Sequence, residues 1–206
     1  DELGAAVEWV PVCPEVECGL PVPREAMHLV GDPAHPRLVT NHTGQDLTRR
    51  MLDYCQKRVE ALAGERLDGF VFKKGSPSSG LERVKIYSAR GLAGKNGRGL
   101  FAAAFVARFP ELPVIEDGML QDRFLRERFL NRIFTAGRWH ELLETARTKQ
   151  GLSEFQGRHK LMLMSHAPGR YAELGRLVET GDFEAYKRKL DELLALRPTA
   201  DRKSVV

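Results

Sequence analysis

The chain has 206 residues, which is enough for one large or two small domains. Its 42% hydrophobic and 29% charged residues are ordinary for a soluble globular protein, and no apolar run reaches the ~20 residues that span a bilayer, so we expect no membrane partner. Three cysteines are too few for a disulfide scaffold and favour a reducing, cytoplasmic setting, where clustered thiols bind metal or do chemistry. The net charge of +4 is compatible with nucleotide or RNA binding, but solvated Arg- and Glu-rich helices are the simpler explanation.

Both ends of the sequence suggest a fragment. The chain opens without Met and runs almost at once into a β-rich stretch. Its last six residues, DRKSVV, are what a common sequencing-library adapter encodes in one reading frame. We therefore expect an N-terminally truncated protein with a non-native tail at residues 201–206, which is excluded from fold reasoning.

The first expected strand leads into a loop rich in thiols and carboxylates. VEWVPV (7–12) is apolar and β-rich, and Pro14 stops it just after Cys13. The loop CPEVECG (13–19) follows, and the proline-rich residues 20–42 predict a long stretch without regular structure.

A helix is expected next, from about Thr43 to Gly64. Thr43 and Asp46 form a capping-box-like pair, and apolar residues then recur every three or four positions. Cys55 lies on this apolar stripe, which favours a packed core thiol over a metal ligand.

Strands are expected again at 67–74, 82–87 and 112–116, with a turn GSPSSG (75–80), a flexible turn at 94–99 and an apolar helix at 100–109 closed by Pro110. Strand, helix and strand in this order predict a βαβ unit with a parallel, Rossmann-like sheet. Sites in parallel sheets form beyond the carboxyl ends of the strands, so CPEVECG and GSPSSG should meet at one sheet edge.

After residue 117 only helical patterns follow. We expect Ser153 to cap a helix that ends before Pro168, and Asp182 to cap the last helix. The sequence thus predicts an α/β domain at 1–117 followed by an all-α domain at 118–200.

The motifs alone leave the chemistry open. The C-x4-C pair is wide for a zinc knuckle, and two thiols in one loop cannot hold a four-iron cluster without a third from elsewhere. GSPSSG suits a phosphate-gripping turn and a plain tight turn equally well, since it lacks the Walker lysine. His159 and His166 lie seven residues apart on a predicted helix, where core packing is the simpler interpretation.

Three long segments resemble one known family. WVPVCPEVECGLPVPRE, FKKGSPSSGLERVKIY and GRGLFAAAFVARFP, in this order, are similar to the thiouracil desulfidase (TudS-like) family, and HKLMLMSHAPGRYAELGRLV resembles the YbgA-like helical domain often fused behind it. The resemblance implies a [4Fe-4S] cluster held by three cysteines with one open iron, which binds the sulfur of a thiolated pyrimidine. It also implies Lewis-acid, non-redox release of sulfide from thiouracil or a thiouridine nucleotide.

The resemblance assigns roles to five residues. Cys13 becomes a cluster ligand and Cys18 a second one, Glu15 the acid/base, and Ser78, with Ser76 behind it, the assisting hydroxyl. Short members carry a cysteine inside the serine turn, where this chain has Ser79. The third cysteine ligand is expected upstream of residue 1, so this chain as given should not hold an intact cluster. The alternative is a nucleotide- or RNA-binding module with structural cysteines.

Overall fold

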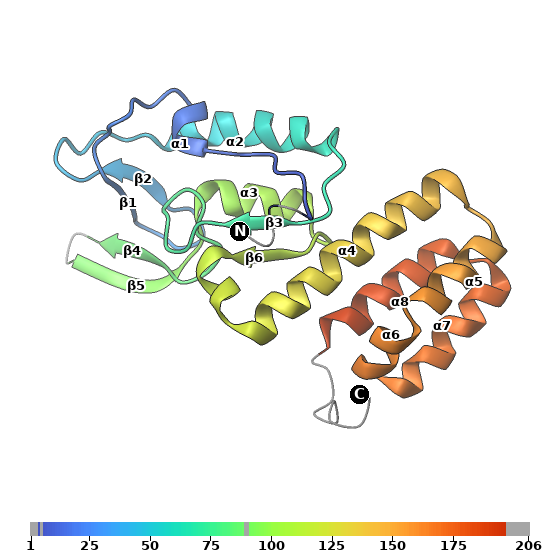
Figure 1. Cartoon of the computed structure of the whole chain (residues 1–206). Helices are drawn as coiled ribbons and strands as arrows, with labels where there is room; N and C mark the ends of the chain where they lie inside the picture. Colours follow the sequence, from blue (N-terminus) through green and yellow to red (C-terminus); the bar gives the residue numbers. More distant parts are fainter. Residues whose placement is uncertain (1–3, 5, 89–90, 197–206) are drawn as a thin grey trace. The chain divides into compact units, whose positions relative to one another are not determined.

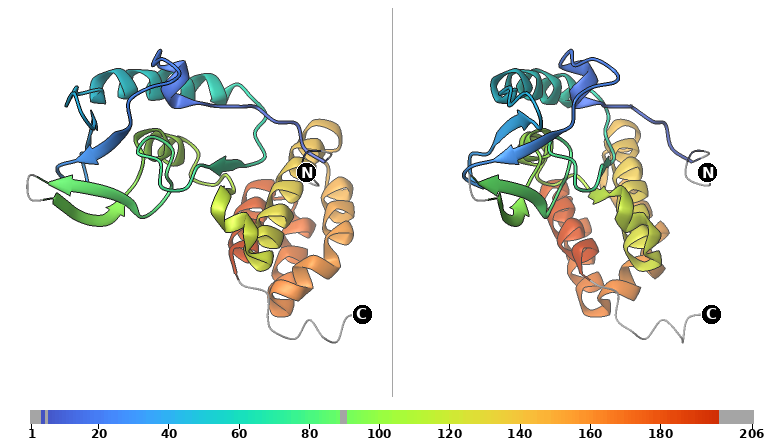
Figure 2. Two further views of the ribbon diagram at one scale, coloured as in Figure 1. Left: turned by 60° about the vertical axis from the view of Figure 1, so that its left-hand side comes forward. Right: turned by 90° about the vertical axis from the view of Figure 1, so that its left-hand side faces the viewer.

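The computed structural model describes residues 4, 6–88 and 91–196, and the chain divides after Gln121 into two compact units (Figures 1 and 2). The expected tail at 201–206 lies outside the described residues. Among the described residues, no helix is both long and apolar enough to cross a membrane.

The first unit contains α1 (Pro14–Glu17), β1 (Met27–Val30), β2 (Arg37–Thr40), α2 (Thr48–Ala63), β3 (Phe70–Phe72), β4 (Val84–Ser88), β5 (Gly91–Gly97), α3 (Leu100–Arg108), β6 (Val114–Glu116) and the 3₁₀ helix η1 (Asp117–Gln121). The second unit contains α4 (Arg123–Thr145), α5 (Lys149–Arg158), α6 (Lys160–His166), α7 (Pro168–Thr180) and α8 (Phe183–Ala195). An α/β unit followed by a helical unit agrees with the predicted fold class.

The larger sheet of the first unit is mixed rather than parallel. Four strands lie in the order β2-β1-β4-β5, in which only β1 and β4 are parallel, and a separate parallel pair joins β3 to β6. The predicted strand at 7–12 is wrong, because this segment carries no strand assignment. The predicted loop at 20–42 is also wrong, since it contains the antiparallel pair β1–β2, and the turn expected at 94–99 begins inside β5. The finer Rossmann-like assignment stays a prediction.

Two helices pack together over the core of this unit. α2 and α3 contact each other, and α1 lies against α2 (Figure 1). Helix α2 starts at Thr48 after Leu47, five residues later than predicted, because Asp46 bonds the N–H of Thr48 and Thr43 instead bonds Glu25. Wholly buried side chains from both helices and from the strands fill the core: Leu29, Leu38, Met51, Ile86, Phe101 and Phe105.

The helical unit has its own core, in which Trp139 stacks on Tyr186 with ring centroids 5.7 Å apart. Asp182 caps α8 through the N–H of Ala185, as predicted. Ser153 does not cap a helix: Thr148 caps α5, and Ser153 lies inside it.

Candidate active site

The motif CPEVECG forms one helical turn. Cys13 is the N-cap residue of α1, Pro14 occupies the first turn, where its missing N–H costs nothing, and Cys18 is the C-cap residue. The Cys13 side chain is exposed, whereas Cys18 is half-buried and packs against the core. The two thiols therefore face different surroundings.

The motif GSPSSG forms a turn that is fixed to the start of α3. The Ser76 hydroxyl accepts the N–H groups of Ser78 and Ser79 at 3.3 and 3.1 Å, and the Ser78 carbonyl accepts the N–H of Phe101 at 2.9 Å. A Cβ on Gly99 would lie 2.3 Å from the carbonyl oxygen of Ser78, so only glycine permits this close approach. The turn therefore rests directly on a core helix.

The two motifs meet through Glu15. The hydroxyl of Ser78, which is fully buried, donates a hydrogen bond to Oε1 of Glu15, and the Ser76 hydroxyl lies 3.5 Å from the same oxygen. The two hydroxyl oxygens are 3.0 Å apart. Each hydroxyl has one proton with which to donate a hydrogen bond. Ser78 donates to Glu15, so Ser76 donates to Ser78 while its own oxygen accepts from the backbone. The protons then point in one direction, towards the carboxylate.

The second carboxylate oxygen of Glu15 faces the thiol. Oε2 lies 3.7 Å from Sγ of Cys13 and 3.7 Å from Nη2 of Arg24. The Glu15 side chain is only 13% exposed, and Arg24 supplies the positive charge that a shielded carboxylate needs. Because the serines occupy Oε1, Oε2 is the oxygen that is available to a reactant.

The prediction that CPEVECG and GSPSSG meet is confirmed, but its reason was wrong. We expected the two segments beyond the ends of neighbouring strands, whereas α1 follows an unpaired extended segment and lies against α2. Lys73, which precedes the serine turn, forms an ion pair with Asp117 at 2.7 Å. Arg24 was missed, because only the folded chain brings it to Glu15.

The remaining two thiols are turned towards the protein interior. The Cys18 thiol donates to the carbonyl of Glu15 at 3.3 Å, and burial raises its pKa. Cys55 is buried as predicted, and burial, together with the charge of Cys18, raises its pKa to about 12.

An iron–sulfur cluster needs a set of converging thiolates, and the described residues do not supply one. Within residues 4, 6–88 and 91–196, no group of three or more Cys, His, Asp or Glu side chains could hold a metal ion. Of the three cysteines, Cys13 alone has an exposed thiol, and this thiol lies beside Glu15. The residues present therefore do not fit a complete four-iron site. The ligand roles of Cys13 and Cys18 stay predictions.

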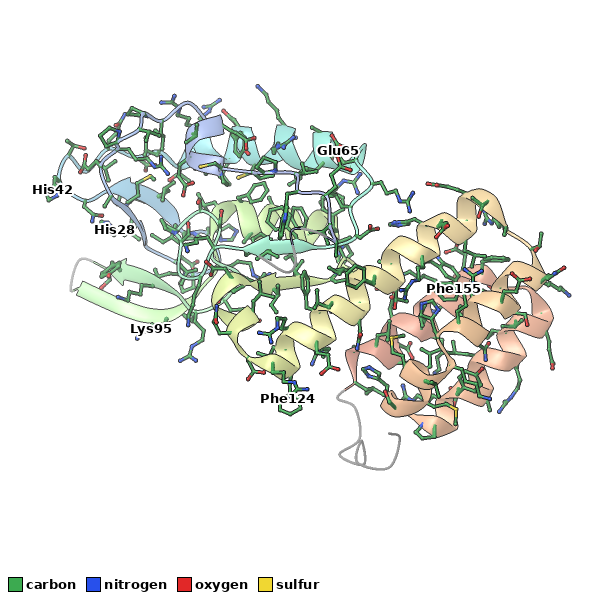
Figure 3. The ribbon with its side chains drawn as sticks, viewed as in Figure 1. His28, His42, Glu65, Lys95, Phe124 and Phe155 are labelled. Carbon is green, nitrogen blue, oxygen red and sulfur yellow. The ribbon has the colours of Figure 1, made fainter. Side chains whose placement is uncertain are left out.

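The histidines contribute nothing to this cluster. His28 belongs to β1 and His42 follows β2 (Figure 3), where His28 bonds Asn41 at 2.7 Å. His159 and His166 are buried in the helical unit, in agreement with the core interpretation.

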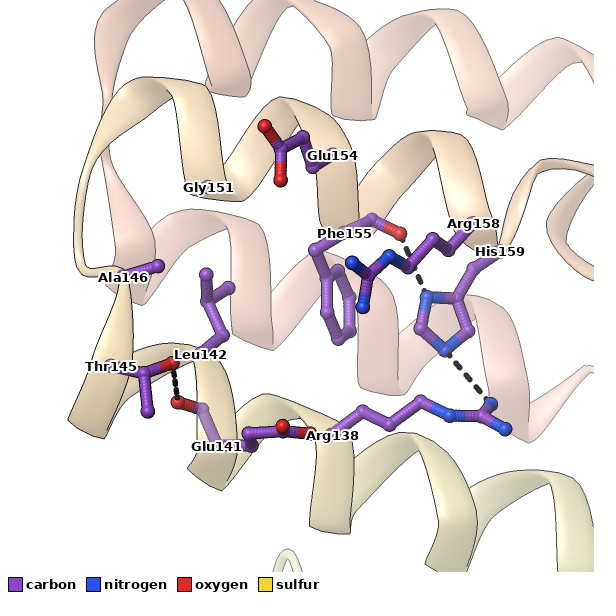
Figure 4. A pocket seen from close by; sticks show the side chains of 10 residues that line it. All are labelled: Arg138, Glu141, Leu142, Thr145, Ala146, Gly151, Glu154, Phe155, Arg158 and His159. Atoms are coloured by element: carbon purple, nitrogen blue, oxygen red, sulfur yellow. Dashed lines mark hydrogen bonds between the residues drawn. The ribbon is translucent and has the colours of Figure 1, made fainter.

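A cavity of about 170 Å³ in the helical unit lies beside His159 (Figure 4). Nδ1 of His159 lies 2.8 Å from the carbonyl of Phe155, so it carries the proton, and Nε2 accepts from Arg138 at 3.3 Å. Burial lowers the pKa of His159, and the charges of Arg138 and Arg158 act in the same direction. Two arginines and two glutamates line the cavity, so its charges balance.

Comparison with known proteins identifies the class of the first unit. The family model of 2-thiouracil desulfurase matches residues 1–117. The chain therefore belongs to the 2-thiouracil desulfurase family.

A solved structure of the [4Fe-4S]-dependent thiouracil desulfidase TudS is also similar. It is 25% identical, with a TM-score of 0.45, over 59% of this chain and 75% of that chain. No curated protein matches the sequence. The family match ends at residue 117, so the YbgA-like resemblance of the helical unit stays a prediction.

Proposed function

We propose that the first unit removes the sulfur of a thiolated pyrimidine, thiouracil or a thiouridine nucleotide, by exchanging it for the oxygen of water. The observation that carries the proposal is the hydrogen bond from the buried Ser78 hydroxyl to Glu15, next to an exposed thiol. Membership of the 2-thiouracil desulfurase family supports the choice of substrate.

The residues support a hydrolytic route in which Glu15 moves the proton. A water molecule attacks the thiocarbonyl carbon, and Oε2 of Glu15 takes its proton while the C=S electron pair moves to sulfur. The hydroxyl proton of the tetrahedral intermediate then passes to sulfur, the C–S bond breaks as the carbonyl forms, and the hydrosulfide that leaves accepts the proton held by Glu15. The sum is thiocarbonyl plus water giving carbonyl plus hydrogen sulfide, with no oxidation or reduction.

Ser78 and Ser76 orient the base in this route. The Ser78 hydroxyl, which accepts from Ser76, donates to Oε1, and this leaves Oε2 directed at the space beside Cys13. The ordered donors also stabilise the ionised carboxylate without rearrangement during the reaction.

Iron–sulfur dependence is part of the proposal, with Cys13 as its first candidate ligand and Cys18 as the second. Because the described residues lack a complete ligand set, no step is assigned to a cluster.

The assay measures uracil formed from 2-thiouracil by chromatography, under anaerobic conditions with iron and sulfide supplied. We expect uracil from the wild-type chain, because the proposed route uses water and Glu15 and assigns no step to a cluster, and we expect its loss in Glu15→Gln. Glu60→Gln is the matched control, because Glu60 forms an ion pair with Arg108 at 3.0 Å on the neighbouring α2. A wild-type chain without turnover, or a Glu15→Gln variant with the wild-type rate, would contradict the proposal.

The alternative is a nucleotide- or RNA-binding module with structural cysteines. The position of Glu15 argues against it, because a carboxylate occupies the serine turn where a phosphate would bind. RNA affinity that falls with salt and is unchanged in Cys13→Ser would favour this alternative.

A further inference from the structure

A single helical turn does not hold its own position in a protein. Helix α1 has only four residues, and nucleating one turn is unfavourable without tertiary contacts. Its place relative to the serine turn must therefore come from other contacts. Since α1 carries both Cys13 and Glu15, these contacts decide the geometry of the site.

Glu17 makes the contacts at the start of α1. Its Oε1 accepts the backbone N–H of Cys13 at 2.7 Å. Its Oε2 accepts the hydroxyl of Tyr54 at 3.0 Å and lies 3.1 Å from Nε of Arg58. One carboxylate thus joins the N-cap residue of α1 to two side chains of α2.

Arg50 makes the contacts at the end of α1. Its Nε donates to the carbonyl of Cys18 and its Nη2 to the carbonyl of Gly19, both at 2.7 Å. Arg50, Tyr54 and Arg58 are four residues apart, so they lie on one face of α2. This face of α2 holds both ends of the turn.

The opposite charges of Glu17 and Arg58 favour the attachment of α1 to α2. Glu17 and Arg58 are only 33% and 22% exposed, so their attraction is less screened than that of a surface pair. Burial raises the pKa of Tyr54, and the hydrogen bond to Glu17 raises it further. The Tyr54 hydroxyl therefore stays protonated and acts as the donor in that hydrogen bond. Glu17, Tyr54 and Arg58 thus connect α1 to α2 through one carboxylate.

We propose that Glu17 is a positioning residue for desulfuration, which places Cys13 and Glu15 by joining the amide of Cys13 to Tyr54 and Arg58. The inference rests on the proposed function. Glu17 acts through the backbone of α1, whereas the carboxylate directed at the reactant belongs to Glu15. A misplacement of about 1 Å costs roughly 100-fold in rate, so loosening α1 should be visible in kcat.

The experiment compares the wild-type chain with Glu17→Ala, Glu17→Gln, Tyr54→Phe and the control Glu60→Gln. Two quantities are measured: kcat and KM for 2-thiouracil, and the hydrogen-exchange rate of the Cys13 amide by NMR. The exchange rate reports directly on the bond between that amide and Glu17 and needs no turnover.

For Glu17→Ala we expect faster exchange at Cys13 and a kcat lower by roughly 10- to 100-fold, with KM within about twofold of wild type. Glu17→Gln keeps an acceptor for the amide and should restore much of both quantities. Tyr54→Phe should give a smaller loss in kcat, which covers the case in which Glu17→Ala does not fold. Glu60→Gln should match wild type in both.

The outcomes separate the two proposals. Faster Cys13 exchange in Glu17→Ala with an unchanged kcat would overturn the inference and leave the proposed function intact. Equal losses of kcat in Glu17→Ala and Glu60→Gln would also overturn it. A wild-type chain without turnover would contradict the proposed function itself, and the inference would fall with it.

Discussion

The hydroxyl of Ser78 donates to Glu15, 63 positions earlier in the chain, while its carbonyl accepts the N–H of Phe101. One residue therefore joins the candidate site to α3, whose Phe101 is completely buried. The position of Glu15 is tied through Ser78 to the rigid part of the fold.

Ser78→Ala should reduce uracil formation by roughly 100-fold, because Glu15 loses the buried donor that orients it. It should also lower the free energy of unfolding by about 1–3 kcal/mol, since a shielded carboxylate loses a hydrogen bond. Ser79→Ala is the matched control, because the Ser79 hydroxyl belongs to the same turn and lies 3.5 Å from that of Ser78. Similar losses in both variants would contradict the role of Ser78.

The three thiols should differ in their reaction with iodoacetamide at pH 8, followed by mass spectrometry of the peptides. Cys13 should react first, because it is exposed. Cys18 should follow slowly, because its raised pKa leaves little thiolate, and Cys55, with a pKa of about 12, should react only on unfolding. Early labelling of Cys55 in the folded chain would contradict this order.

Gly19→Ala should destabilise the first unit more than Gly44→Ala. Both glycines have positive φ, +86° and +65°, so each alanine is strained by about 1–2 kcal/mol. A Cβ on Gly19 would also lie 2.5 Å from Nη2 of Arg50, whereas nothing lies within 4 Å at Gly44. Urea unfolding of the two variants therefore isolates the displacement of Arg50, and equal losses would show that Arg50 adapts freely.

The helical unit should lose stability on acidification. His159 has a lowered pKa in the folded state, so below about pH 6.5 the unfolded chain binds a proton that the folded chain resists. The stabilisation is present above that pH and is lost as the pH falls. The free energy of unfolding, measured by the fluorescence of the buried Trp139, should therefore fall between pH 7.5 and pH 5.5. His159→Gln should reduce this fall, and His35→Gln, at an exposed site, should leave it unchanged.

The sequence indicated the elements with strong local signals. The apolar α3, strand β4 and the cap at Asp182 appear as expected, because periodicity and capping act over a few residues. The strands β1 and β2 were missed because prolines 33 and 36 dominate the segment, although both prolines lie in the connection between the strands. Residues 7–12 have β propensity, but a strand also needs a partner.

The candidate site was predictable in part. Glu15, Ser76 and Ser78 were named from motifs, and the structure brings them together. The burial of Cys18 and the approach of Arg24 depend on the packed fold, so no local pattern reveals them. Arg50, Tyr54 and Arg58 recur at an interval of four, but their partners, the residues 17–19, lie more than thirty positions away in the sequence.

The attachment of the serine turn to α3 has a consequence for how a reactant enters. Freeing the Ser78 hydroxyl by moving its backbone would break the first hydrogen bonds of a helix that is anchored by Phe101 and Phe105. Opening on the serine side thus requires partial melting of α3, whereas α1 is held by side-chain bonds, to α2 through Glu17 and to the serine turn through Glu15. We therefore expect the motion that admits a pyrimidine ring to occur at α1, which carries Cys13, while the serine turn keeps its position.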